Sequence, residues 1–312
     1  MQKQSSRGVE YIEIGEAGGQ RVDNFLMAHL RGVPRSRIYR LLRKGEVRVN
    51  GGRVKALYRL RVGDIIRVPP VYFSDKGKQV YVNEHQRKLL KSAILFEDNQ
   101  LLVLNKPAGW AVHGGSGINH GIIEIARALW NDPKLELAHR LDKGTSGCLL
   151  VAKSRAALKI LHASLRERSM KKRYSLIVYG KWNSRVKTIR FPLHRFILPS
   201  GERRVKVASD GKPSRTDFEI KKEGSQATWL HAFPYTGRTH QIRVHCLANG
   251  HGIVGDEKYF HESSDSVKQM HFGGGLCLHA DRIRVDFQGR ELKFEAPLPE
   301  SFELAWNRLS QD

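Results

Sequence analysis

One carboxylate beside an arginine stands out in the segment His139–Gly147, which reads HRLDKGTSG. The aspartate of this segment, Asp142, lies in a glycine-bearing loop, and an apolar run from Cys148 to Ala152 follows it. A polar loop that leads into a buried strand presents its side chains at the edge of the core, where functional sites concentrate. Asp142 is therefore a candidate nucleophile or base. The alternative is an aspartate that only accepts hydrogen bonds from the amides of its own turn.

A second cluster combines hydroxyl, imidazole and guanidinium groups in the segment 236–245, which reads TGRTHQIRVH. Thr239 is placed to cap a helix that ends at Asn249–Gly250. On that helix His240 and Arg243 stand about one turn apart. Such a pair can bind a phosphate or form an ion pair with a carboxylate.

Two further segments carry single candidate residues. Lys106 lies in LNKPAG at residues 104–109, a pattern that indicates a strand ending in a tight turn. Its ammonium is either solvated or available to a polyanion. Tyr174 follows three basic residues in KKRY at 171–174 and opens a strand. A tyrosine in this position either stacks on a base or is half buried in a sheet.

The elements that must position these residues can be read from residue 92 onward. Strand-type patterns occur at 94–96, 101–104, 147–152, 173–182, 214–220, 227–233 and 282–295, the last folded back at Gln288–Gly289. Helical patterns occur at 121–130, 155–169 and 239–249. Strands joined by short turns, with helices inserted between them, predict an α+β fold with a mainly antiparallel mixed sheet. The chain has no GxGxxG before a helix and no P-loop motif, so folds that bind nucleotide cofactors are not indicated.

The N-terminal region has the pattern of a separate small domain between Gly19 and Pro70. A first helix ends before Pro34; a second begins with Ser36 as its cap and ends at Gly45 in a left-handed conformation. Short strands follow around the turns at 50–52 and 63–64. We therefore expect a tail at 1–18, a small α/β domain at 19–70, a polar linker at 71–91 and the main domain at 92–312.

The charge of the chain indicates a polyanionic partner. Its 312 residues include 54 Lys and Arg against 31 Asp and Glu, which gives a formal net charge of +23. An excess of this size on a folded protein is typical of nucleic-acid binding. A basic membrane-surface protein is the alternative, but no long helix combines a cationic face with a large apolar one. The second helix of the small domain carries Arg35, Arg37, Arg40, Arg43 and Lys44, which are candidate contacts to a nucleic acid.

Several other classes of protein are not indicated. No apolar run reaches the roughly eighteen residues of a membrane helix, and the polar N-terminus lacks the apolar core of a secretory signal. The three scattered cysteines fit neither a disulfide framework nor a zinc knuckle. The spacing of His240, His245 and His251 does not place them on one helix face, so we expect no metal. A cytoplasmic, monomeric protein without a cofactor is the remaining expectation.

Taken together, these segments resemble the RluA-type pseudouridine synthases. The resemblance is carried, in the family's order, by LNKPAGWAVH (104–113), HRLDKGTSG (139–147), KKRYSLIVYG (171–180), GRTHQIRVH (237–245), GDEKY (255–259) and LHA (278–280). It spans nearly all of residues 92–298. The small N-terminal domain resembles the RNA-binding domain first described in ribosomal protein S-four. The combination is most similar to family members that act on large-subunit (23S) ribosomal RNA.

The resemblance implies that the protein isomerises uridine to pseudouridine in RNA without a cofactor. Asp142 corresponds to the family's essential aspartate, and Tyr174 to the tyrosine that stacks on the target base. Arg243 corresponds to the basic residue that pairs with the aspartate. Whether the aspartate attacks the ribose or removes its 2′ proton stays open. Further candidate contacts to the substrate RNA are Arg140, Lys106 and His240.

Two other functions stay open on the sequence. The same chemistry on other ribosomal RNA sites or on tRNA is one of them, and the N-terminal domain favours ribosomal RNA over tRNA. A non-catalytic RNA-binding factor in ribosome assembly is the other. The presence of Asp142, Tyr174 and Arg243 together favours the enzyme.

Overall fold

The computed structural model describes residues 8–15, 18–30, 33–71, 81–114, 120–260 and 275–311. The chain divides into two compact units, Met1–Gln79 and Val80–Asp312. Each unit has its own hydrophobic core. No helix in the described ranges is long and apolar enough to cross a membrane.

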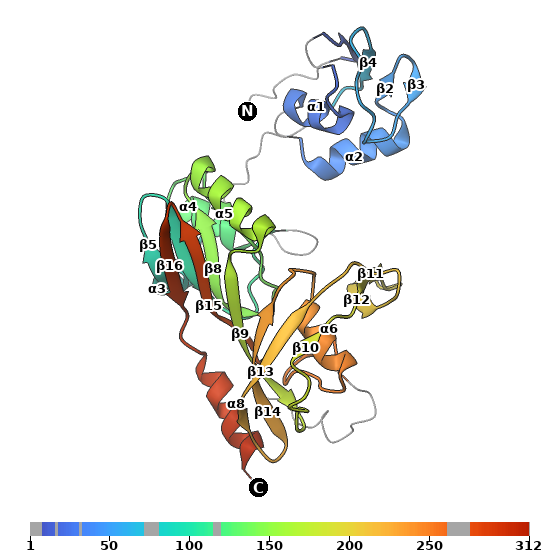
Figure 1. The fold of residues 1–312 in the computed structure, drawn as a ribbon. Helices are drawn as coiled ribbons and strands as arrows, with labels where there is room; N and C mark the ends of the chain where they lie inside the picture. The colour runs from blue at the N-terminus through green and yellow to red at the C-terminus, as the bar shows by residue number, and fades with distance from the viewer. Residues whose placement is uncertain are drawn as a thin grey trace. The chain divides into compact units, whose positions relative to one another are not determined.

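The N-terminal unit packs two helices, α1 (Val22–His29) and α2 (Arg35–Lys44), on a small sheet (Figure 1). The sheet has the order β1-β4-β2-β3, and its strands are β1 (Glu10–Glu13), β4 (Ile65–Val68), β2 (Arg48–Val49) and β3 (Gly52–Arg53). Apolar residues at helical spacing on α1 and α2 are fully buried, so the helices present one face to the sheet and the other to solvent. The buried set includes Val22, Leu26, Ile38, Leu41 and Ile66.

Two expectations for this unit are corrected. The predicted tail at 1–18 contains β1, which pairs with β4 in antiparallel register from Glu10↔Val68 to Glu13↔Ile65. Alternation of polar and apolar residues over only four positions is too short a signal to distinguish from a tail. Ser36 is not a cap, because α2 begins at Arg35 with Pro34 as its N-cap. The left-handed C-cap at Gly45 is confirmed, with φ of 69°.

The larger unit is built on one long sheet with the order β10-β13-β14-β9-β15-β8-β6-β5. Its strands are β5 (Ile94–Glu97), β6 (Leu101–Lys106), β8 (Ser146–Ala152), β9 (Lys171–Tyr179), β10 (Thr188–Ile189), β13 (Thr216–Glu223), β14 (Ala227–Pro234) and β15 (Leu278–Phe287). β16 (Arg290–Glu295) pairs with β15, and β7 (Glu136–Leu137) pairs with β8. The pairing of β15 with β8 is parallel and the other pairings of this sheet are antiparallel. The predicted α+β class with a mainly antiparallel mixed sheet is confirmed.

Helices cover both faces of this sheet. Alternate residues of β6 and β8 enter different cores, because side chains of a strand point to opposite faces in turn. One face packs against α4 (Ile122–Leu129), and the other packs against α5 (Arg155–Glu167). The C-terminal helix α8 (Glu300–Ser310) lies along β14 (Figure 1), where Trp229 contacts Phe302 and Trp306 at ring-centroid distances of 5.3 and 5.6 Å.

Two elements complete the unit. The hairpin of β11 (Leu193–Ile197) and β12 (Arg203–Val207) packs beside helix α6 (Gln241–Ala248). The helix α3 (Glu84–Ser92) lies inside the segment 71–91 that we expected to be a linker. Its N-terminus has a capping box, in which Asn83 accepts from the amide of Gln86 and Gln86 accepts from the amide of Asn83. The polar composition of the segment hides this helix, since only Leu90 is buried.

Candidate active site

A small pocket of about 90 Å³ brings together the residues singled out in three separate segments of the sequence. It is formed by the loop before β8, the start of β9, and the turn that leads into α6. The predicted residues that line it are Arg140, Asp142, Tyr174, His240 and Arg243. The structure therefore places five of the predicted site residues around one cavity.

Asp142 stands at the pocket with its side chain 28% exposed. Its backbone carbonyl accepts a hydrogen bond from the amide of Thr145 at 3.1 Å, which closes the turn before β8. Its carboxylate oxygen Oδ1 lies 4.0 Å from Nε2 of His240, which is ion-pair distance and longer than a hydrogen bond. The turn thus fixes the backbone of Asp142, while the carboxylate oxygens accept no hydrogen bond from the described residues.

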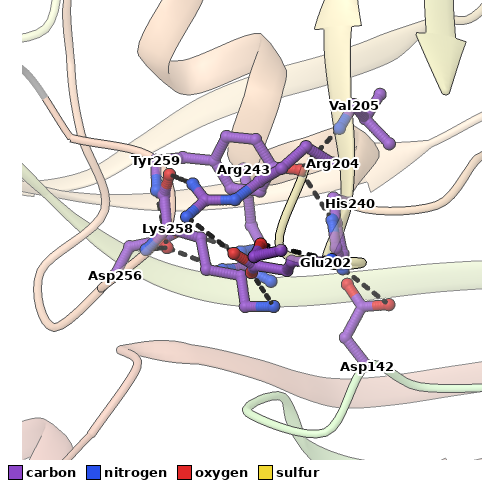
Figure 2. Close-up of polar contacts among 10 residues, drawn as sticks. Asp142, Glu202, Arg204, Val205, His240, Arg243, Asp256, Lys258 and Tyr259 are labelled. Atoms are coloured by element: carbon purple, nitrogen blue, oxygen red, sulfur yellow. Dashed lines mark hydrogen bonds and ion pairs between the residues drawn. The ribbon is translucent and has the colours of Figure 1, made fainter. Parts of the chain in front are cut away.

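Arg243 forms its ion pair with a different carboxylate from the one that we expected. Its Nε and Nη2 atoms donate to the two oxygens of Asp256 at 2.7 and 2.6 Å (Figure 2). Burial alone would lower the pKa of Arg243, but the hydrogen bonds and charge of Asp256, with the charge of Asp142, outweigh burial and raise it. Arg243 therefore stays a cation that acts on Asp142 through its field, while Asp256 fixes its orientation.

The helix α6 begins at Gln241, and its N-cap residue His240 has a left-handed backbone with φ of 53°. Thr239 is not the cap that we predicted; its hydroxyl accepts a hydrogen bond from Arg195 at 3.2 Å. The sequence cannot show this, because either residue can stand at the start of the same helical pattern. The left-handed turn directs the His240 ring to Asp142, and the ring is only 12% exposed.

His240 is hydrogen-bonded to Tyr259 (Figure 2). The Tyr259 hydroxyl accepts from the amide of Val205 at 2.9 Å and lies 2.7 Å from Nδ1 of His240. The other ring nitrogen, Nε2, is the one that faces Asp142. Burial lowers the pKa of His240 against the opposing effect of Asp142, so the ring is neutral near pH 7.

Tyr174 forms the buried wall of the pocket, with 9% of its surface exposed. Burial raises the pKa of its hydroxyl, and the negative charge of Asp142 raises it further. The backbone of Tyr174 pairs across the sheet with Ala232 of β14, which fixes the residue at the edge of the pocket. Tyr174 is therefore a neutral phenol whose aromatic ring borders the space beside the carboxylate.

Lys106 was expected to contact RNA, which would require it to be at the surface. The structure places it in the interior instead. The side chain is fully buried, and its ammonium donates to the carbonyls of Pro107, Trp110 and Lys143 at 2.8, 2.7 and 3.1 Å. Burial lowers its pKa to about 7, opposed by the charge of Asp142. Lys106 ties the end of β6 to the loop of Asp142. A lysine in a turn gives no sign in the sequence that its head group is buried.

The basic residues predicted on α2 lie on the N-terminal unit. Arg35, Arg40, Arg43 and Lys44 are exposed and Arg37 is half buried. None of the five forms an ion pair with a carboxylate of the described residues. The helix thus presents uncompensated positive charge, because Ile38, Leu41 and Leu42 take its buried face.

Several residues that line or support the pocket were not among the predicted site residues, and three of them carry charge or a hydroxyl that bears on the site. Asp256 and Tyr259 lie in GDEKY, and they orient Arg243 and His240. Lys172 lines the pocket from β9. A carboxylate three positions before a tyrosine after a Gly turn is the only local signal for the first two, and it is a weak one. No cluster of three or more His, Cys, Asp or Glu that could hold a metal occurs among the described residues.

Comparisons with known proteins agree with this geometry. Residues 100–248 match the model of the RNA pseudouridylate synthase family, and residues 20–66 match the S4 domain. The chain is 51% identical to ribosomal large subunit pseudouridine synthase C of Yersinia pestis, over 93% of this chain and 92% of that one. It is 45% identical to the protein of the same name in Escherichia coli K12, over 98% of both chains.

Solved structures show the same fold. The human RNA pseudouridylate synthase domain containing 1 is 27% identical, with a TM-score of 0.55 over 66% of this chain and 83% of that one. The human RNA pseudouridylate synthase domain containing 4 is 24% identical, with a TM-score of 0.58 over 72% of this chain and 95% of that one. The pocket of Asp142, Tyr174 and Arg243 therefore lies in an enzyme fold of known type, and the chain belongs to the RluA-type RNA pseudouridine synthases that carry an N-terminal S4 domain.

Proposed function

We propose that this synthase converts uridines of large-subunit (23S) ribosomal RNA to pseudouridine, and that Asp142 starts the reaction on a uridine turned out of its stack. The observation that carries the proposal is the single pocket that Asp142, Tyr174 and Arg243 line. The relatives from Yersinia pestis and Escherichia coli, which are named for the large ribosomal subunit, support the choice of RNA.

The isomerisation conserves atoms and electrons. The bond between N1 of uracil and C1′ of ribose breaks, the base turns, C5 bonds to C1′, and the C5 proton is replaced in effect by one on N1. Asp142 opens the sequence either as a nucleophile at C1′ or as a base at the 2′ carbon, and both routes use the ionised carboxylate. Arg243 lines the same pocket, and Nε2 of His240 lies 4.0 Å from Oδ1 of Asp142.

Tyr174 has two tasks in this proposal. Its ring stacks on the extruded base, which replaces part of the stacking lost from the RNA. Its hydroxyl is protonated at neutral pH because burial and the charge of Asp142 raise its pKa. The phenol therefore enters the reaction as a proton donor or acceptor only in concert with the substrate, and never as a free phenolate.

Extruding a base costs a few kcal/mol, and contacts to phosphates offset this cost. The exposed cations of α2, with Arg140 at the pocket, supply such contacts in our proposal. These cations neutralise phosphates and do not contact base edges. They therefore increase the affinity for RNA but do not determine which uridine is modified. We further propose that the protein acts as a monomer in the cytoplasm.

The proposal is tested with large-subunit ribosomal RNA tritiated at C5 of uridine. Wild-type protein is expected to release tritium, whereas Asp142→Asn releases none and binds the RNA within about twofold of wild type, because affinity is spread over many phosphates. Release by Asp142→Asn contradicts the role of the carboxylate. Release from tRNA but not from ribosomal RNA or its precursor particles contradicts the proposed substrate, and no release from any of these RNAs contradicts the activity of this chain.

A further inference from the structure

A second, larger cavity of about 400 Å³ adjoins the pocket of Asp142. The two cavities share one wall, which consists of Lys172, Pro234, Thr236, Gly237 and Arg238. The volume of the larger one lies in the range of sites for small organic molecules. Whatever occupies it while uridine is in the first pocket therefore lies next to that uridine.

The lining of the larger cavity is strongly cationic. Arg168, Lys171, Lys172 and Arg238 contribute positive charge. The carboxylate that also lines the cavity, Asp217, is held in a two-bond ion pair by Arg215, at 2.9 Å for each bond. The four cations thus face the cavity without an acidic partner in it, and an anion is the ligand that this lining selects.

Lys172 lies at the junction of the two cavities and is the most informative of these cations. Burial lowers its pKa, and no charged neighbour contributes to that shift. In the described part of the chain, its ammonium has no hydrogen-bond acceptor and no carboxylate partner. Its Nζ atom is 4.0 Å from the place where a side chain on Gly237 would begin, so the glycine leaves the approach to the ammonium open.

Lys106, in the same unit, is a buried lysine whose hydrogen bonds are all made within the protein. Its ammonium donates to three carbonyls. Lys172 is only partly buried, and its ammonium is not among the buried polar atoms that lack a partner, so the head group is open to the cavity. The ammonium of Lys172 is therefore available to a ligand in the cavity, whereas the protein's own carbonyls saturate that of Lys106.

We propose that Lys172 binds the phosphodiester that joins the target uridine to its neighbour, and that the larger cavity receives that neighbouring nucleotide. The inference rests on the proposed function, because it takes the smaller pocket as the uridine site. Tyr235, at 45% exposure, offers the neighbouring base an aromatic ring, which the guanidinium of Arg168 approaches to 4.6 Å. Lys172 is thus assigned as a substrate-binding residue that fixes the backbone on one side of the extruded uridine.

The test combines a change in the protein with a change in the RNA. Fragments of ribosomal RNA around a mapped target uridine are made with one neutral methylphosphonate linkage, placed 5′ or 3′ of that uridine. With wild-type protein, one of the two positions is expected to raise the half-saturating concentration in single-turnover tritium release about tenfold. With Lys172→Gln, unmodified RNA already shows that loss, and the neutral linkage adds less than about twofold.

The matched control is Lys159→Gln, which removes an exposed lysine of α5. In this variant the neutral linkage is expected to keep its full effect. Equal effects of the linkage in wild type and Lys172→Gln overturn the proposal. This failure differs from that of the proposed function, in which wild-type protein releases no tritium from unmodified RNA.

The free protein provides a readout that is independent of activity. Lys172→Met removes a partly exposed cation that has no acceptor among the described residues, so its melting temperature is expected to be no lower than that of wild type. A lysine with a purely structural role gives a lower melting temperature when it is replaced. A lower melting temperature for Lys172→Met therefore overturns the proposal even if the variant binds RNA poorly.

Discussion

At the scale of single residues, Lys106 is a fully buried side chain that supports the loop of Asp142 without lining the pocket. It donates to the carbonyls of Pro107 and Trp110 after β6 and to that of Lys143 beside Asp142. Its task is therefore to hold the loop of Asp142 against the strand. A residue that acts in this way affects stability and turnover together.

Lys106→Met keeps the apolar stem and removes the ammonium, which leaves three carbonyls without a donor. We expect the free energy of unfolding to fall by about 3 kcal/mol and turnover to fall with it. Urea unfolding and single-turnover tritium release measure the two effects. The exposed control Lys159→Met should change unfolding by less than about 0.5 kcal/mol. A Lys106→Met protein as stable as this control would contradict the role of Lys106.

The residues of the pocket differ in how far the sequence could predict them. Asp142, Tyr174 and Arg243 carry chemistry in recognisable motifs, and the structure places them around one cavity. The partner of Arg243 could not be predicted, because Asp256 reaches it through a turn 13 residues later. The same holds for the burial of Lys106, since burial depends on which segments fold over a residue and not on its neighbours in the chain.

At the scale of elements, β8 and β15 meet at a glycine. Gly147 has φ of 107°, and a Cβ there would lie 2.3 Å from the carbonyl oxygen of Ala280. The two strands pair in parallel at this point, through His279↔Ser146 and Ala280↔Gly147. The loop of Asp142 leads directly into this pairing, so the close approach sets the position of the carboxylate.

Gly147→Ala combines a clash with backbone atoms and an unfavourable φ. We expect it to lower the free energy of unfolding by more than about 3 kcal/mol and to impair turnover. The control is Gly289→Ala, which also has a positive φ of 78° but meets nothing within 4 Å. That change should cost only about 1 kcal/mol. Equal unfolding curves for the two variants would show that close packing at Gly147 is unimportant.

The element that we expect to contribute most to the salt dependence is α2. A variant with Arg35, Arg40 and Arg43 replaced by Gln should keep its fold, since these side chains are exposed and the apolar face of the helix is unchanged. Each phosphate that the variant no longer neutralises should reduce the slope of log affinity against log salt by about 0.7 to 0.9. Filter binding to ribosomal RNA at several salt concentrations measures this slope. An unchanged slope would mean that α2 does not contact RNA.

At the scale of the whole molecule, five of the described histidines of the larger unit have lowered pKa values, with burial as the largest cause in each. Burial lowers the pKa of His139 to about 3 and that of His245 to about 4, from an ordinary value of 6.5. The remaining three are His231, His240 and His279. Unfolding exposes these rings to water, where they take up protons that the folded state does not bind.

The pKa values of these histidines are lower in the folded state than in the unfolded state. Their contribution to the free energy of unfolding is therefore fully present above pH 6.5 and is lost as the pH falls toward the folded pKa values. Each histidine that binds a proton only on unfolding removes about 1.4 kcal/mol per pH unit. We expect the midpoint of urea unfolding to decrease steeply between about pH 6.5 and about pH 5. His139→Gln should make this dependence shallower by one proton, and an identical slope would refute the assignment.

Local elements of the molecule could be predicted, and its long-range order could not. The helices at 155–169 and 239–249 and the turn at Gln288–Gly289 are confirmed as α5, α6 and the turn between β15 and β16. The order of the strands is not encoded in local periodicity, because β15 pairs with β8 and β9 across more than a hundred residues. The helix α3 was missed because it buries a single leucine.

The place of β15 has a consequence for the synthesis of the protein on the ribosome. β15 lies between β8 and β9 in the sheet, although it is the penultimate strand of the chain. Asp142 enters the pocket from the β8 side and Tyr174 from the β9 side, so a nascent chain that has not yet emerged beyond Phe287 lacks the strand that joins them. Until then two strand edges stay open to wrong partners. The enzyme thus becomes able to modify RNA only after β15 has been synthesised and has joined the two strands.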